Sequence, residues 1–240
     1  MIMMKLHDNG PVIEFPDGRR AIVDTGFSGT EILSTGDLRP VDINDRDIRP
    51  AISGLDLDGI AGEIGADRLD LLIGAAVLHE GFTVDLRNGS FVFSVESPLP
   101  DEEVAAVLPY SRRNSGPILS PVVELQIGDE KVTAVFDTGA PYSIWKRRAA
   151  EPDRPAHVAR SDFHVANGGQ ITRFPVLMRR ESLRIGSVEL DLNMAYMPDS
   201  FPTYYPDCVI GMDVPKALSA TRLVLDPESL EIRFYRSRRI

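Results

Sequence analysis

Two aspartates, Asp24 and Asp137, stand in the same local setting in this chain. Each follows an apolar, β-branched run that is typical of a buried strand, and each begins the tripeptide Asp-Thr-Gly. A carboxylate at the end of a core strand is costly unless it is hydrogen-bonded, so stability alone does not favour this pattern. Two carboxyls held close together share one proton, so that one can accept a proton from water while the other donates. The pattern therefore indicates acid–base chemistry.

A second block follows each aspartate, and the two blocks match. Residues 71–74 and 208–211 each consist of apolar residues ending in a glycine, and each block leads to a strand–Asp–turn–strand pattern, over 82–93 and 222–234. One Asp-Thr-Gly is weak evidence because it also makes an ordinary turn. Two of them in matching surroundings indicate an internal duplication of roughly half the chain. A hairpin is expected to feed each Asp-Thr-Gly turn.

The repeated Asp-Thr-Gly and apolar–apolar–Gly blocks resemble the aspartic proteases, and their short spacings resemble the retropepsin-like branch. The resemblance covers about residues 11–93 and 117–236. It implies an all-β fold with two retropepsin-like (acid protease) β-barrel lobes in one chain, related by pseudo-two-fold symmetry. We expect an N-terminal lobe over 1–96, a linker over 97–116 and a C-terminal lobe over 117–240 that carries the flap. A short helix over 101–108 is the alternative for part of the linker.

The resemblance also implies roles for individual residues. Asp24 and Asp137 would form the catalytic pair, with the threonines cross-linking the two turns and the glycines leaving room for the backbone. The residues that support the pair would be Thr25, Gly26, Thr138 and Gly139. The substrate-binding residues would be Phe27, Ala140, Ala166, Asn167, Gly168 and Gly169. The blocks ending at Gly74 and Gly211 are expected to pack beneath the turns and then begin short helices.

The interval between the two blocks is longer in the second half, which leaves room there for a flap. Residues 162–172 are two strand-like runs around Asn-Gly-Gly, a composition typical of a hairpin tip. The first half has little room for a second flap. Its residues 31–70 are rich in acids, proline and glycine, and form either solvated loops with short strands or an acidic rim that attracts basic peptides.

The residues after the two glycines bear on the pH at which such a pair would work. Pepsin-like enzymes usually place a hydroxyl residue there, which lowers the pKa of the carboxylate through a hydrogen bond. Phe27 and Ala140 occupy these positions and have no such group. We therefore predict activity at mildly acidic to near-neutral pH.

Composition excludes several other classes of function. The net charge is −10 with no basic stripe, which argues against nucleic-acid binding, and no stretch is long and apolar enough to span a membrane. The single cysteine, Cys208, rules out an intrachain disulfide, and with no signal-like start it indicates a cytoplasmic protein. The histidines have no metal-binding spacing and no phosphate loop is present, so no metal or cofactor is predicted.

The sequence thus predicts an aspartic endopeptidase with restricted specificity, acting on a peptide or protein substrate, with both lobes in one monomeric chain. The alternative is a catalytically inactive peptide-binding module on the same fold. The two differ in whether replacing Asp24 or Asp137 abolishes cleavage or leaves peptide binding unchanged.

Overall fold

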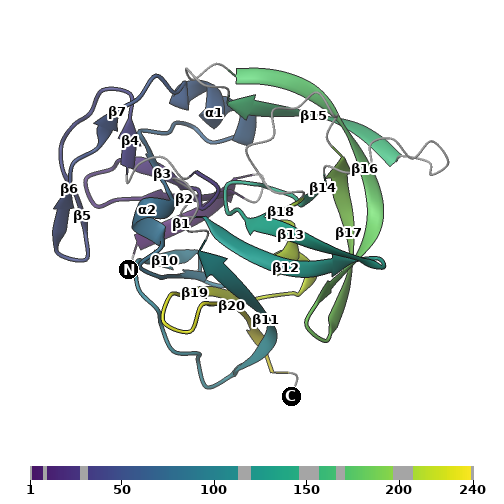
Figure 1. The fold of residues 1–240 in the computed structure, drawn as a ribbon. Coiled ribbons are helices and arrows are strands. Elements are labelled where there is room, and N and C mark those ends of the chain that lie inside the picture. Colours follow the sequence, from purple (N-terminus) through teal and green to yellow (C-terminus); the bar gives the residue numbers. More distant parts are fainter. Residues whose placement is uncertain are drawn as a thin grey trace.

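The computed structural model describes residues 2–7, 10–27, 32–112, 120–145, 157–165, 171–196 and 208–238, and within these residues the chain is mostly β-structure (Figure 1). We refer to residues 1–96 as the first half and to residues 117–240 as the second half. The all-β expectation holds, with three short helices among the described residues.

The first half builds its Asp-Thr-Gly turn on a small sheet. The strands of this half are β1 (Ile2–His7), β2 (Gly10–Glu14), β3 (Arg20–Val23), β4 (Ile32–Ser34), β5 (Val41–Ile43), β6 (Arg46–Ile48), β7 (Ala51–Ile52), β8 (Leu71–Ile73), β9 (Phe82–Asp85) and β10 (Ser90–Val92), of which β5 and β6 form a separate two-stranded sheet. The predicted hairpin is β2–β3, and β3 runs straight into Asp24. Strand β8 lies parallel to β3 and antiparallel to β4, and β4 lies parallel to β7.

The second half repeats these pairings. Its strands are β12 (Pro121–Ile127), β13 (Glu130–Phe136), β14 (Ile144–Trp145), β15 (His157–Val165), β16 (Ile171–Ile185), β17 (Val188–Tyr196), β18 (Cys208–Ile210), β19 (Arg222–Asp226) and β20 (Glu231–Ser237). The hairpin β12–β13 leads to Asp137, and β18 lies parallel to β13 and antiparallel to β14, which lies parallel to β17. The repeat in the sequence therefore has a counterpart in the strand pairing.

The two halves differ in whether their strands close into a barrel. In the second half the pairings run β12–β13–β18–β14–β17–β16 and back to β12, which closes a six-stranded barrel. The closing strand β16 is 15 residues long and reaches both β17 and β12. In the described part of the first half, β7 has 2 residues and pairs only with β4, so no corresponding ring forms.

The halves join through a shared antiparallel sheet in the order β1–β10–β9–β19–β20–β11, where β11 spans Glu102–Arg112. Strand β9 of the first half pairs directly with β19 of the second, with Val84 opposite Leu223. One large apolar cluster contains residues of both halves, and Phe136 and Phe234 meet edge-on within it at 6.2 Å between ring centroids. The two halves thus bury their apolar surface together.

The alternative of a short helix over 101–108 is wrong, because this stretch lies in strand β11. Ala106, Leu108 and Tyr110 alternate as buried residues, which is the period of a strand. Residues 102–109 of this strand pair with β20 and residues 110–112 pair with β12, much as β1 pairs first with β10 and then with β2. The segment predicted as a linker therefore contains an element of the shared sheet.

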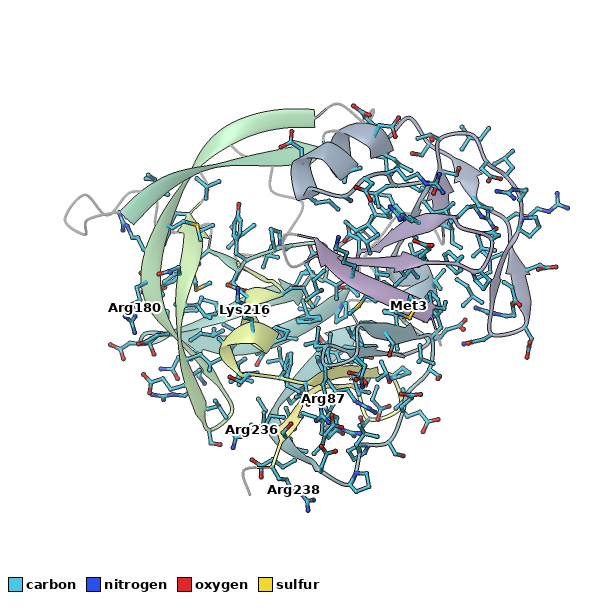
Figure 2. The ribbon with its side chains drawn as sticks, turned by 180° about the vertical axis from the view of Figure 1, so that it is seen from behind. Met3, Arg87, Arg180, Lys216, Arg236 and Arg238 are labelled. Atoms are coloured by element: carbon cyan, nitrogen blue, oxygen red, sulfur yellow. The ribbon has the colours of Figure 1, made fainter. Side chains whose placement is uncertain are left out.

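Ion pairs and a backbone hydrogen bond hold the start of β11 against its neighbours in the shared sheet. Arg87, in the turn between β9 and β10, pairs with Asp101 at 2.8 Å, and Arg236 of β20 pairs with Glu103 at 2.8 Å. The backbone N–H of Arg238 donates to the Asp101 carbonyl at 2.8 Å. Arg87, Arg236 and Arg238 lie in the same region of the molecule in Figure 2.

Helix α1 (Leu57–Ile64) was not predicted. Asp56 caps its start by accepting from the Gly59 N–H at 2.8 Å, and Gly65 ends it in the left-handed conformation with φ 72°. Leu57, Ile60, Ala61 and Ile64 are buried at the spacing of one helix face. The expectation of loops and short strands over 31–70 holds for β4–β7 but misses this helix.

The long hairpin expected in the second half is confirmed in its strands. β15 and β16 pair antiparallel up to Val165 opposite Ile171, and they form an arm that arches over the molecule in Figure 1. The predicted substrate-binding residues Ala166, Asn167, Gly168 and Gly169 fall at its tip and lie outside the described residues.

Candidate active site

The two Asp-Thr-Gly turns are joined by crossed hydrogen bonds between their threonines. The Thr25 hydroxyl donates to the Phe136 carbonyl at 2.8 Å, and the Thr138 hydroxyl donates to the Val23 carbonyl at 2.7 Å. Each hydroxyl oxygen also accepts from the other threonine's backbone N–H, at 2.9 and 3.1 Å. Both threonines are fully buried. The two threonines thus link the two turns through four hydrogen bonds.

Each glycine faces the aspartate of the other turn. A Cβ at Gly26 would lie 2.2 Å from Asp137 Oδ2, and a Cβ at Gly139 would lie 2.6 Å from Asp24 Cγ. These distances are shorter than any real contact, so neither position admits a side chain without displacing a carboxyl. The Gly26 N–H also donates to Asp137 Oδ1 at 3.2 Å. The glycines thus allow the two turns to interlock.

The structure brings the carboxyls of Asp24 and Asp137 together, and they are hydrogen-bonded to each other. Asp137 Oδ1 accepts from the N–H groups of Gly139 at 2.8 Å and Gly26 at 3.2 Å, whereas Asp24 Oδ1 accepts from the Phe27 N–H at 2.9 Å. Both aspartates keep partial solvent exposure on one side. Among the described residues, neither has an ion pair with a basic side chain.

The electrostatics of the two carboxyls differ. Burial raises the pKa of Asp24 well above its ordinary value, and the neighbouring charge of Asp137 raises that pKa further. Burial also raises the pKa of Asp137, but hydrogen bonds from Asp24 and from backbone amides counteract part of that rise. Both carboxyls are therefore harder to ionise than an ordinary aspartate, and the ionisation of one affects the ionisation of the other.

The blocks ending at Gly74 and Gly211 pack beneath the turns, as predicted. The N–H groups of Asp24 and Asp137 donate to the carbonyls of Ile73 and Ile210, each at 2.9 Å. A Cβ at Gly211 would lie 2.6 Å from the carbonyl carbon of Tyr142, so the turn rests directly on this glycine. Short helices follow both blocks, α2 (Ala75–Leu78) and α3 (Asp213–Ala217).

Sequence reasoning missed a polar contact under the second turn. Ser143 donates to Asp213 twice, from its N–H to Oδ2 at 2.9 Å and from its hydroxyl to Oδ1 at 2.7 Å, and its hydroxyl oxygen accepts from the Gly211 N–H at 3.1 Å. Burial raises the pKa of Asp213, opposed by the hydrogen bonds from Ser143. The first half has Ala76 where the second half has Asp213, two positions after the glycine. This difference is the feature of the sequence that could have indicated the contact.

Phe27 and Ala140 have different surroundings. Phe27 is half-buried and packs on the apolar cluster beneath α1, whereas Ala140 is buried in a cluster with Ile144 and Val209. Their backbones are held alike, since the Ala75 N–H donates to the Phe27 carbonyl at 2.8 Å and the Met212 N–H donates to that of Ala140 at 2.9 Å. Neither side chain can hydrogen-bond to a carboxyl.

Comparison with known protein families agrees with this geometry. Residues 123–214 match the aspartyl protease family, a stretch that contains Asp137, the β15–β16 hairpin and Gly211 but not Asp24. No curated protein matches the chain.

Within the described residues, no three histidine, cysteine, aspartate or glutamate side chains gather as metal ligands would. No helix in the described part has the length and apolar character that crossing a membrane requires.

Proposed function

We propose that this protein is an aspartic endopeptidase whose catalytic residues are Asp24 and Asp137. The observation that carries the proposal is the interlocking of the two turns, in which each glycine lies against the other turn's carboxyl and the threonines are hydrogen-bonded across. This arrangement brings the two carboxyls close to each other, and both aspartates stay partly exposed to solvent. The aspartyl protease match in the second half supports the same conclusion.

The unequal surroundings assign a role to each carboxyl. Asp137, whose carboxylate accepts two backbone N–H groups, is the base that takes a proton from the attacking water. Asp24 holds the shared proton and donates it to the carbonyl oxygen of the scissile bond. The water oxygen adds to the carbonyl carbon, and the resulting tetrahedral species expels the amine after a proton transfer to its nitrogen. No covalent bond to the protein forms.

The proposal includes the two-lobed arrangement. The recurring strand pairings support one lobe over 1–96 and one over 117–240, each supplying one aspartate, so that a single chain holds a complete pair. The β15–β16 hairpin is the proposed flap over the bound peptide, with Phe27, Ala140 and the hairpin tip as substrate contacts. The first half supplies no second long hairpin within its described residues.

The test compares Asp24→Asn and Asp137→Asn with Asp129→Asn, which changes an exposed aspartate in the β12–β13 turn. Cleavage of a denatured protein or a peptide library is followed by mass spectrometry. Each dyad variant should lose at least about a thousandfold in rate because half a pair cannot complete the proton cycle, while Asp129→Asn should match the parent. Cleavage that survives either dyad variant contradicts the proposal. Peptide binding by the parent without any product would instead favour the non-catalytic peptide-binding alternative.

A further inference from the structure

Two apolar clusters lie at corresponding places in the two halves. In the first half Leu33 pairs opposite Leu72, and in the second half Ile144 pairs opposite Val209, each between corresponding strands. Leu33 and Leu72 belong to the cluster beneath α1, and Ile144 and Val209 belong to the cluster around Ala140. The residue after each Asp-Thr-Gly joins the cluster of its own half, Phe27 in one and Ala140 in the other.

A different element packs on each of the two apolar clusters. In the second half the cover comes from Val176 and Met178 of β16, the strand that continues into the long hairpin. In the first half the cover is α1, through Leu57, Ile60 and Ile64. The helix is capped at both ends and all its apolar residues are buried, so it is a permanent part of that half's packing.

Phe27 connects the helix to the catalytic pair. Its N–H donates to Asp24 Oδ1 at 2.9 Å, so its backbone lies beside the carboxyl, while its half-exposed ring packs on the cluster beneath α1. Ala140 occupies the matching position beside Asp137 with a single methyl group. The residue beside Asp24 therefore carries a large ring that packs on the α1 cluster, whereas the residue beside Asp137 carries only a methyl group.

We infer that Phe27 and α1, together termed the first-half plug, determine specificity by closing the first-half side of the site to large substrate side chains. The inference rests on the proposed function and names its substrate class. Such substrates carry a large apolar side chain on the flank of the scissile bond over the second half, where Met178 is partly exposed and Ala140 takes up little room, and a small residue on the other flank.

The experiment profiles cleavage of a peptide library by the parent, Phe27→Ala, Phe27→Leu and the control Leu55→Ala. Leu55 also packs on the cluster beneath α1 but precedes the helix rather than adjoining Asp24. The parent should accept large apolar residues on one flank only. Phe27→Ala should raise kcat/KM by about tenfold or more for peptides with a large residue on the restricted flank, Phe27→Leu should raise it less, and Leu55→Ala should leave the profile unchanged.

Binding separates this inference from the proposed function. The same library is captured on Asp137→Asn with and without Phe27→Ala, which needs no turnover, and thermal unfolding checks that every variant is folded. In one outcome, the parent cleaves no peptide while the variant with Phe27→Ala captures peptides that carry a large residue on the restricted flank. That result contradicts the proposed function and supports the first-half plug. A parent profile that is equally tolerant on both flanks, or a Leu55→Ala shift equal to that of Phe27→Ala, overturns the plug.

Discussion

The two halves of this protein hold the same Asp-Thr-Gly turn in different arrangements of strands. Corresponding strands place Asp24 and Asp137 on matching carbonyls of Ile73 and Ile210, yet the second half closes into a barrel and the first half does not. The second half adds the Ser143–Asp213 contact beneath its turn, and the first half adds helix α1 above its outer cluster. The Asp-Thr-Gly turn is therefore the feature that both halves keep. A closed barrel holds it in the second half, and strands that do not close into a barrel hold it in the first.

The two carboxyls also differ in their hydrogen bonds. Asp137 Oδ1 accepts from the N–H groups of Gly139 and, across the pair, of Gly26, while Asp24 Oδ1 accepts from the N–H group of Phe27. Because hydrogen bonds to a carboxylate stabilise its charge, this difference is the reason for proposing Asp137 as the base.

Among changes that leave both aspartates in place, the largest expected effect comes from filling the glycine positions. Gly26→Ala and Gly139→Ala should each reduce peptide cleavage by about a hundredfold or more, because the new methyl group would collide with the opposite carboxyl and move it by an ångström or so. Gly62→Ala is the matched control, since a Cβ there meets nothing within 4 Å in the interior of α1 and should stabilise the helix slightly. A Gly26→Ala enzyme with normal activity would break the view that the two turns interlock.

The next effect tests whether the halves unfold together. Arg222 of β19 is buried beside Glu102 of β11 at 3.4 Å and approaches Asp85 of β9 at 3.8 Å. Arg222→Ala leaves the buried Glu102 without its strongest cationic neighbour, so the free energy of unfolding should fall by about 3–5 kcal/mol. Chemical denaturation followed by tryptophan fluorescence at Trp145 and by circular dichroism measures it. Coincident transitions indicate one cooperative unit, and separate transitions would instead indicate independently stable halves.

Much of this frame could be predicted from the sequence because the information is local. The two turns, their feeding hairpins and the glycine blocks each follow from residue types within a few positions. Helix α1 was missed, although its buried residues have helical spacing, because Gly59 and Gly62 lower its intrinsic propensity and only packing on the sheet stabilises it. Strand β11 was missed because Pro109 and an acidic start suggest a linker, while pairing with the distant strands β20 and β12 decides the conformation. The Ser143–Asp213 contact joins residues far apart in sequence.

A smaller effect should follow from removing the contact that the second half has and the first lacks. Asp213→Ala leaves the N–H and hydroxyl of Ser143 without their acceptor, which should lower the free energy of unfolding by about 1–3 kcal/mol and reduce activity through the second turn. Asp191→Ala, which removes an exposed ion pair with Arg180, is the control and should change stability by no more than about 0.5 kcal/mol. Equal losses in both variants would argue against a supporting role for Asp213.

The smallest effect distinguishes the two carboxyls by pH. The pKa of Asp24 is raised in the folded chain, so its ionisation costs free energy in the folded state above that pKa, and the cost disappears as the pH falls through it toward the unfolded value. Asp24→Asn should therefore raise the melting temperature at neutral pH by on the order of a few degrees and lose this gain in acid. Asp137→Asn should gain less, because its carboxylate already accepts two backbone N–H groups. Melting curves of both variants from acid to neutral pH measure the ranking, and a larger gain for Asp137→Asn would reverse the assignment of acid and base.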